Sequence, residues 1–163
     1  LGAPTILQVV STTKTDTFSA SVTAGASVAV TGLSITHTMA SASNKLLITA
    51  FFGAAASSAN RAQVAMALAD GGTLVNVGDA AGSRTLVTAG GPSAATTSTV
   101  VIQNISATFL YEPGDTASHT YDLHAINSTT ATETIYINRT ESAADDAARV
   151  RSVSSLIIQE VAG

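Results

Sequence analysis

Short apolar runs separated by polar or glycine-rich breaks recur along the whole 163-residue chain. The run from Ser152 to Val161 has apolar residues on both faces of a strand: Leu156 and Ile158 on one face, and Val153, Ile157 and Val161 on the other. A strand with one wet face alternates apolar and polar residues, so this pattern predicts a strand covered on both faces in the interior of a sheet. The opening run, Thr5 to Val10, is two-faced in the same way. We therefore expect the N-terminal and C-terminal strands to be central and to pair with each other.

Further strands are predicted between the two ends. Residues 28–39 read as a bent or bulged strand that is interrupted at Gly32. Residues 45–52 are apolar on both faces and predict a second buried strand. The turn Asp70-Gly71-Gly72 supplies the positive φ angles that a hairpin needs, and it joins the strands expected at 62–68 and 73–77. The remaining strands are expected at 85–88, 99–110 (the longest), 119–126 and 134–139.

This pattern indicates the fold class. About ten short strands spaced by roughly 8–15 residues are typical of an all-β, antiparallel β-sandwich of the jelly-roll type. Residues 141–148 have room for one helical turn, too short and polar to matter architecturally. A chain of 163 residues fits a single domain over positions 1–163.

The composition is unusual in its low charge. Charged residues make up 11% of the chain, hydrophobic residues 45%, and the mean hydropathy is +0.34. Soluble domains usually carry about 25% charged residues. One explanation is a compact domain coated with Thr and Ser. The other is burial of much of the surface in an oligomer, which we favour because obligate interfaces are depleted in charge.

The charge and residue content also exclude several kinds of partner. The net charge is −4, and with only Lys14 and Lys45 as lysines there is no basic stripe to bind nucleic acid. The absence of cysteine excludes disulfides and thiolate metal sites. No apolar run reaches the roughly 18–20 residues of a membrane span. The start, Leu-Gly-Ala-Pro, lacks a basic segment, so we expect no signal peptide, and Leu1 in place of Met suggests a processed or trimmed start.

Metal sites are not predicted. His119 and His124 have opposite strand parity and cannot share a metal from one face. Asp122 and His124 share a face but lack a third ligand. The acidic pairs, Asp145 with Asp146 and Glu112 with Asp115, do not have the spacing of a calcium loop.

Catalytic motifs are also missing. The chain has no Gly-x-Ser-x-Gly elbow, and residues 78–84 resemble a phosphate loop but lack its lysine and following helix. Three Asn-x-Ser/Thr triplets begin at Asn104, Asn127 and Asn138, and we attribute them to the abundance of Ser and Thr. We therefore predict that the protein is not an enzyme and has no catalytic, cofactor-binding or metal-binding residues.

Four segments carry a family resemblance: ILQVVSTTKTDTFS, VNVGDAAGSRT, YINRTES and SSLIIQEVAG. They resemble the small β-sandwich virion proteins of phages that infect cyanobacteria and other aquatic bacteria, and the resemblance spans nearly the whole chain. It implies a trimer on the outside of a phage particle, either a capsid cement (decoration) protein or the distal module of a tail fibre or tailspike. It carries over no functional residues, because the family has no defined site motif.

The partners implied are two further copies of the chain, the major capsid protein or other virion proteins, and a host surface glycan or receptor. The short chain without a stalk favours a capsid cement protein over a receptor-binding tail module. Two other classes stay open. A carbohydrate-binding β-sandwich module would need exposed aromatic residues, yet the chain has no Trp and only three Tyr. A secreted or surface-layer structural protein should show a signal or repeats.

Overall fold

The structure is a computed structural model that describes residues 5–56, 63–91 and 101–163. These residues form eleven strands in two sheets. The six-stranded sheet contains β1 (Ile6–Lys14), β2 (Phe18–Val22), β4 (Lys45–Ala56), β8 (Gln103–Tyr111), β10 (Glu133–Ile137) and β11 (Ser154–Val161). The five-stranded sheet contains β3 (Ser27–Thr38), β5 (Val64–Asp70), β6 (Thr73–Val75), β7 (Ala89–Gly90) and β9 (Ser118–Asn127). No membrane-crossing helix is found in the part of the chain that the structure describes.

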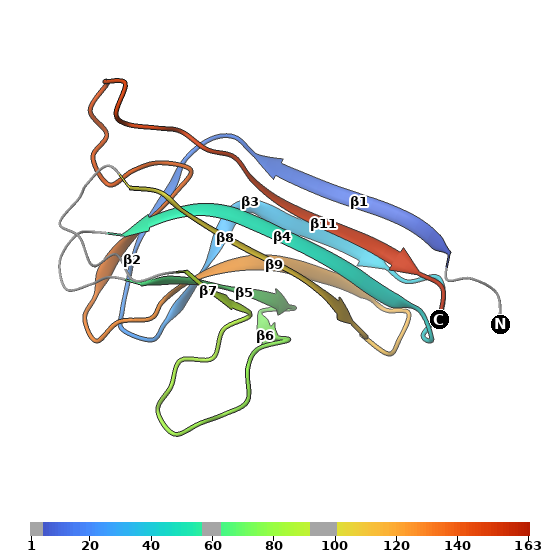
Figure 1. The fold of residues 1–163 in the computed structure, drawn as a ribbon. Coiled ribbons are helices and arrows are strands. Elements are labelled where there is room, and N and C mark those ends of the chain that lie inside the picture. The colour runs from blue at the N-terminus through green and yellow to red at the C-terminus, as the bar shows by residue number, and fades with distance from the viewer. Residues whose placement is uncertain (1–4, 57–62, 92–100) are drawn as a thin grey trace.

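The two sheets lie face to face, and all the strand pairs are antiparallel (Figure 1). The six-stranded sheet has the order β1-β11-β4-β10-β2, with β8 also paired to β4. The five-stranded sheet has the order β3-β9-β5-β6, with β7 also paired to β5. The predicted all-β, antiparallel β-sandwich is confirmed, while its jelly-roll type stays a prediction.

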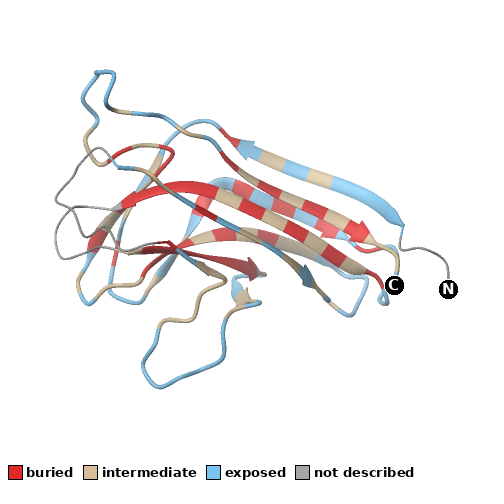
Figure 2. Cartoon of the chain, in the orientation of Figure 1, coloured by how far each residue is buried: buried red, intermediate tan, exposed pale blue. Residues whose placement is uncertain are grey.

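The two terminal strands pair as expected, but only one of them is central. β11 lies between β1 and β4, and it pairs with β1 in a register that sets Val10 opposite Ile158. β1 forms the edge of the sheet, so the prediction of a central N-terminal strand is wrong. Within the described ranges β1 pairs only with β11, and its apolar residues Ile6, Leu7 and Val9 are exposed (Figure 2). Apolar residues on both faces of a strand predict burial only where other parts of the protein cover both faces.

The prediction that both faces of β11 are covered is correct for only one face within a protomer. Leu156 and Ile158 are fully buried in the core between the sheets. Ile157 and Val161 point to the other side and are half-buried. The strand is therefore central in its sheet, with a dry inner face and a partly open outer face.

The core lies between the sheets and is built by the inward residues of both. The largest fully buried side chains include Tyr121, Phe52, Leu33, Ile48 and Leu123. A second, small cluster lies on the outside of the five-stranded sheet, where Ala65, Ala67 and Ile126 are covered by Leu74, Val77 and Val87. The segment after β5 thus folds back over the outer surface of its own sheet.

Two local predictions are confirmed by backbone geometry. Gly32 has a φ of 89°, and the pairing of β3 with β9 shifts register between Ala29 and Ser34, which makes β3 a bulged strand. The hairpin of β5 and β6 turns at Gly71 and Gly72, with φ of 56° and 84°. Glycine adopts these positive φ angles at no steric cost.

Other boundaries differ from the predictions. Residues 85–88 are not a strand, and β7 follows them. Of the strand expected at 99–110, residues 99 and 100 lie outside the described residues, and β8 begins at Gln103. It is not the longest described strand, because β3 and β4 have 12 residues each. Residues 141–148 form turns and bends rather than a helical turn. β2 was not predicted, because its small alternating residues resemble a polar connection.

Candidate functional site

The outer face of the six-stranded sheet presents a grid of uncharged side chains. Three rows cross β1, β11, β4 and β8 in register. The rows are Val9, Gln159, Leu47 and Leu110; Ser11, Ile157, Thr49 and Thr108; and Thr13, Ser155, Phe51 and Ser106. All twelve are exposed or half-buried, and none is charged. We call this set the uncharged face.

Apolar and hydroxyl side chains are mixed on the uncharged face. Val9 is 56% exposed on β1, and Leu110 is 53% exposed on β8, so the largest apolar areas lie toward the two edges. Thr49 and Thr108 share a hydrogen bond of 3.3 Å in the middle. At one end of the sheet, beyond these three rows, Lys45 pairs with Glu112 at 2.6 Å.

The outer surface of the five-stranded sheet is different. It carries the titratable residues Asp122 and His124, and exposed serine and threonine side chains line β3. At β5 it is covered by the chain itself through Leu74, Val77 and Val87. The protein therefore covers the apolar part of one outer surface and leaves the uncharged face open. Open apolar patches on a sheet are typical of protein–protein contact sites.

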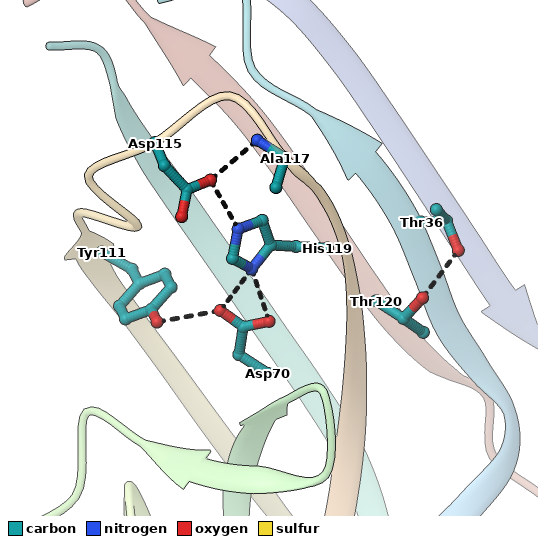
Figure 3. A network of polar contacts seen from close by, with 7 residues as sticks. All are labelled: Thr36, Asp70, Tyr111, Asp115, Ala117, His119 and Thr120. Carbon is teal, nitrogen blue, oxygen red and sulfur yellow. Dashed lines mark hydrogen bonds and ion pairs between the residues drawn. The ribbon is translucent and has the colours of Figure 1, made fainter. Parts of the chain in front are cut away.

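A second candidate site lies at one end of the sandwich, around His119 (Figure 3). Its Nδ1 is 2.8 Å from both carboxylate oxygens of Asp70 on β5, and its Nε2 is 2.9 Å from Asp115 in the β8–β9 turn. The Tyr111 hydroxyl donates to Asp70 at 3.0 Å, and the Ala117 N–H donates to Asp115 at 2.7 Å. An imidazolium donates from both nitrogens, so the charged form of His119 fits this site.

The electrostatics of this cluster follow from its geometry. The hydrogen bonds that His119 donates to Asp115 and Asp70 raise its pKa above the usual 6.5. The same contact with His119 lowers the pKa of Asp115. Burial, together with the Asp70 carboxylate, raises the pKa of the Tyr111 hydroxyl to about 12. The groups thus link β5, β8, β9 and the connecting turn as an ionic latch, without any activated nucleophile.

Tyr121 closes the inner side of this latch. Its ring stacks on His119 with centroids 5.9 Å apart and meets Tyr111 edge-on at 6.0 Å. Its hydroxyl is buried and has no hydrogen-bond partner among the described residues, and burial raises its pKa. The predicted inward orientation of Tyr121 is confirmed.

A buried polar cluster ties β3 to β11. Glu160 is 1% exposed and accepts hydrogen bonds from the Ala40 N–H at 2.8 Å and the Asn44 side chain at 2.5 Å. His37 Nε2 lies 3.1 Å from its other oxygen. Burial alone would raise the pKa of Glu160, but these hydrogen bonds outweigh burial and lower it. These contacts fasten β11 to the end of β3 and to the loop that connects β3 with β4.

The residues weighed from sequence are separated as expected. His124 lies on the outer surface beside Ser27, 3.2 Å away, while His119 belongs to the latch on the other side of β9. Burial lowers the pKa of His124. Within the described ranges, no group of three or more His, Asp or Glu residues is placed to hold a metal ion.

Sequence reasoning missed the latch because Asp70 and His119 are 49 positions apart. It also gave no weight to the uncharged face, which appears only once the register of four strands is known. Two of the three glycosylation triplets are excluded in the folded chain, since Asn127 and Asn138 are buried and their amides are hydrogen-bonded to the backbone.

Comparison with protein-family models found no match, and no curated protein matches the chain.

Proposed function

We propose that this protein is a structural component of the exterior of a bacteriophage virion, a homotrimeric cement protein that reinforces the capsid shell. The observation that carries the proposal is the uncharged face, with Val9 and Leu110 exposed at its two edges. The resemblance of the four segments supplies the virion context. Together they explain why only 11% of the residues are charged.

The shape of the uncharged face suits a closed trimer. A cyclic trimer joins two different patches of each subunit around the ring. The uncharged face has two such patches, one on β1 and the adjoining β11, and one on β8 and the adjoining β4. Contact between them would cover Val9, Ile157 and Leu110 without burying an unpaired charge, which is costly.

The layout of the chain leaves one end of the sandwich free for contacts with other virion proteins. Thr5 and Ala162 lie at one end of the sandwich, where the Ala162 N–H donates to the Thr5 carbonyl at 2.9 Å (Figure 1). The opposite end is left to loops such as 139–151, which are available to contact another virion protein. A passive binding role of this kind requires no catalytic group.

Light scattering of the purified chain tests the assembly. We expect a mass three times the 16.3 kDa of the protomer. A monodisperse monomer at micromolar concentration would contradict the proposal. Cryo-electron microscopy of the parent particle tests the location, with density expected on the shell rather than on the tail.

A receptor-binding module at the tip of a tail fibre or tailspike is the second candidate. It is favoured by a cavity in the 139–151 loop, described below. A carbohydrate-binding module that stacks sugars on exposed aromatic rings has less support, because Tyr121 is fully buried and Tyr111 and Tyr136 are half-buried.

A further inference from the structure

The connection from β10 to β11 forms a closed loop with its own cavity. An antiparallel bridge between Arg139 and Arg151 holds the two ends of the loop together. The loop lies at the end of the sandwich away from the termini (Figure 1). Its residues enclose a cavity of about 240 Å³. This is below the roughly 300–1,000 Å³ of sites for drug-sized ligands, so it fits a smaller one.

The cavity concentrates cationic groups in a chain whose net charge is −4. Arg139, Arg149 and Arg151 all line it, together with Asp145 and Asp146. Three of the seven Lys and Arg residues of the chain therefore surround one small space.

Arg149 has a hydrogen-bond donor without a described partner. Its Nη1 pairs with Asp146, at 3.3 Å from Oδ1 and 3.2 Å from Oδ2. Its Nε is buried and has no hydrogen-bond partner among the described residues. A buried donor without a partner costs free energy, and a small turn of the side chain toward the cavity that Arg149 lines would let this donor meet an acceptor. The Nε side of a guanidinium is one of the forks that bind a carboxylate with two parallel hydrogen bonds.

The other two arginines have different roles. Arg139 is held in place: its Nε donates to the Thr140 carbonyl at 3.0 Å, its Nη2 donates to the Glu141 carbonyl at 2.7 Å, and its guanidinium lies 4.9 Å from the centre of the Tyr136 ring. The Arg151 side chain makes no ion pair or hydrogen bond with any described residue, so its charge is available to a ligand.

The cavity wall also offers acceptors and a hydroxyl. Asp145 has no described partner, and the Ser142 hydroxyl accepts from the Ala144 N–H at 3.4 Å while keeping its own proton to donate. An inorganic anion would use the arginines but would be repelled by Asp145 and Asp146. A ligand with both a carboxylate and hydroxyl groups could pair its carboxylate with the arginines and donate from its hydroxyls to the aspartates.

We propose that the 139–151 loop binds a small polyhydroxylated carboxylate, the chemistry of a uronic acid, with Arg149 and Arg151 holding its carboxylate and Asp145 accepting from its hydroxyls. The site lies outside the uncharged face, and the proposal does not depend on the trimer or on the virion location. No covalent step is involved.

Isothermal titration of the full chain with sodium glucuronate tests the site, with glucose and sulfate as comparison probes. We expect saturable millimolar binding of glucuronate and none of glucose. Arg149→Gln and Arg151→Gln should each weaken glucuronate binding by roughly tenfold or more, because each removes a charged hydrogen-bond donor. Arg84→Gln, at an exposed arginine of another loop, should bind as the unchanged protein does.

Absence of saturable glucuronate binding would overturn the proposal, as would equal binding by the Arg149→Gln and Arg84→Gln variants. Sulfate binding as tight as glucuronate would show a simple anion site and would equally reject it. If Arg149→Gln lowers the melting temperature through loss of its pair with Asp146, Arg151→Gln decides the question. Light scattering of the same samples reports the trimer separately, so the two proposals fail independently.

Discussion

Leu156 and Ile157 are consecutive residues of β11 that face opposite sides of the six-stranded sheet. Leu156 is fully buried opposite Ala50, in the core between the sheets. Ile157 is half-buried opposite Thr49, in the middle row of the uncharged face. One face of β11 thus packs in the protomer core, and its other face lies in the proposed subunit contact.

Alanine substitutions should separate these two roles. Leu156→Ala leaves a cavity in the core and should lower the free energy of unfolding by roughly 2–5 kcal/mol at any protein concentration. Ile157→Ala should cost the monomer less, since the residue is half-buried, but its melting temperature should fall further on dilution because assembly stabilises by mass action. Thermal melts across a hundredfold range of concentration measure both effects. A concentration-independent melt for the unchanged protein and for Ile157→Ala would argue against the interface.

A charge placed on the uncharged face should prevent assembly. Thr108→Lys puts a lysine beside Thr49 in the centre of the face, where a neighbouring subunit would have to desolvate it. We expect light scattering to show monomer, with the far-ultraviolet circular dichroism unchanged. Ser34→Lys is the matched control, because Ser34 is an exposed residue in the middle of β3 on the opposite outer surface. Equal masses for both variants would place the interface elsewhere.

Local features of this fold could be predicted from the sequence because they depend on neighbouring residues. The alternation around Tyr121 and Leu123 correctly gave their inward orientation, and the glycine pair Gly71 and Gly72 correctly gave a hairpin. Both signals are steric and short-range, so one segment is enough to read them.

Features that depend on distant partners could not be predicted. The parity of Val9 and Val10 is the same at an edge as in the centre of a sheet, so the edge position of β1 has no signal of its own. The ionic latch needs Asp70 and His119 to be brought together by the pairing of β5 with β9. The sequence supplied the residues of these sites, but only the register supplied their arrangement.

The latch should make stability depend on pH. The pKa of His119 is raised in the folded protein by Asp115 and Asp70, so its stabilisation is complete below the unfolded value of 6.5 and is lost as pH rises through the folded pKa. We therefore expect the melting temperature to fall as pH rises above the unfolded value of 6.5. His119→Gln should remove this fall.

A second histidine provides the control for this measurement. Burial lowers the pKa of His124, so its contribution has the opposite sign and is lost as pH falls. His124→Gln should therefore keep the loss of stability at high pH and remove the contribution that is lost as pH falls below 6.5. If His119→Gln and the unchanged protein gave the same profile, the latch would not be ionic.

Asn138 should be among the least replaceable polar residues. It is fully buried and has a φ of 62°, a left-handed conformation that asparagine tolerates better than most residues. Its amide donates to the carbonyls of Lys14 and Asp16 at 2.9 and 3.0 Å, and its oxygen accepts from the Ser154 hydroxyl at 2.6 Å. One side chain thus fastens the β1–β2 connection to the start of β11.

Replacing Asn138 by alanine would leave the buried Lys14 carbonyl, the partly buried Asp16 carbonyl and the Ser154 hydroxyl without this partner. Since each buried group left unpaired costs about 1–3 kcal/mol, Asn138→Ala should lower the free energy of unfolding by at least roughly 3 kcal/mol in urea titrations. Asn138→Gly should recover about 1–2 kcal/mol of the conformational part, because glycine adopts the left-handed region freely, but none of the hydrogen bonds. Asn104→Ala is the control, since Asn104 begins the same kind of triplet but is exposed on β8. Similar stabilities for the Asn138→Ala and Asn104→Ala variants would mean that water satisfies these groups and that the β1–β2 connection is fastened by other contacts.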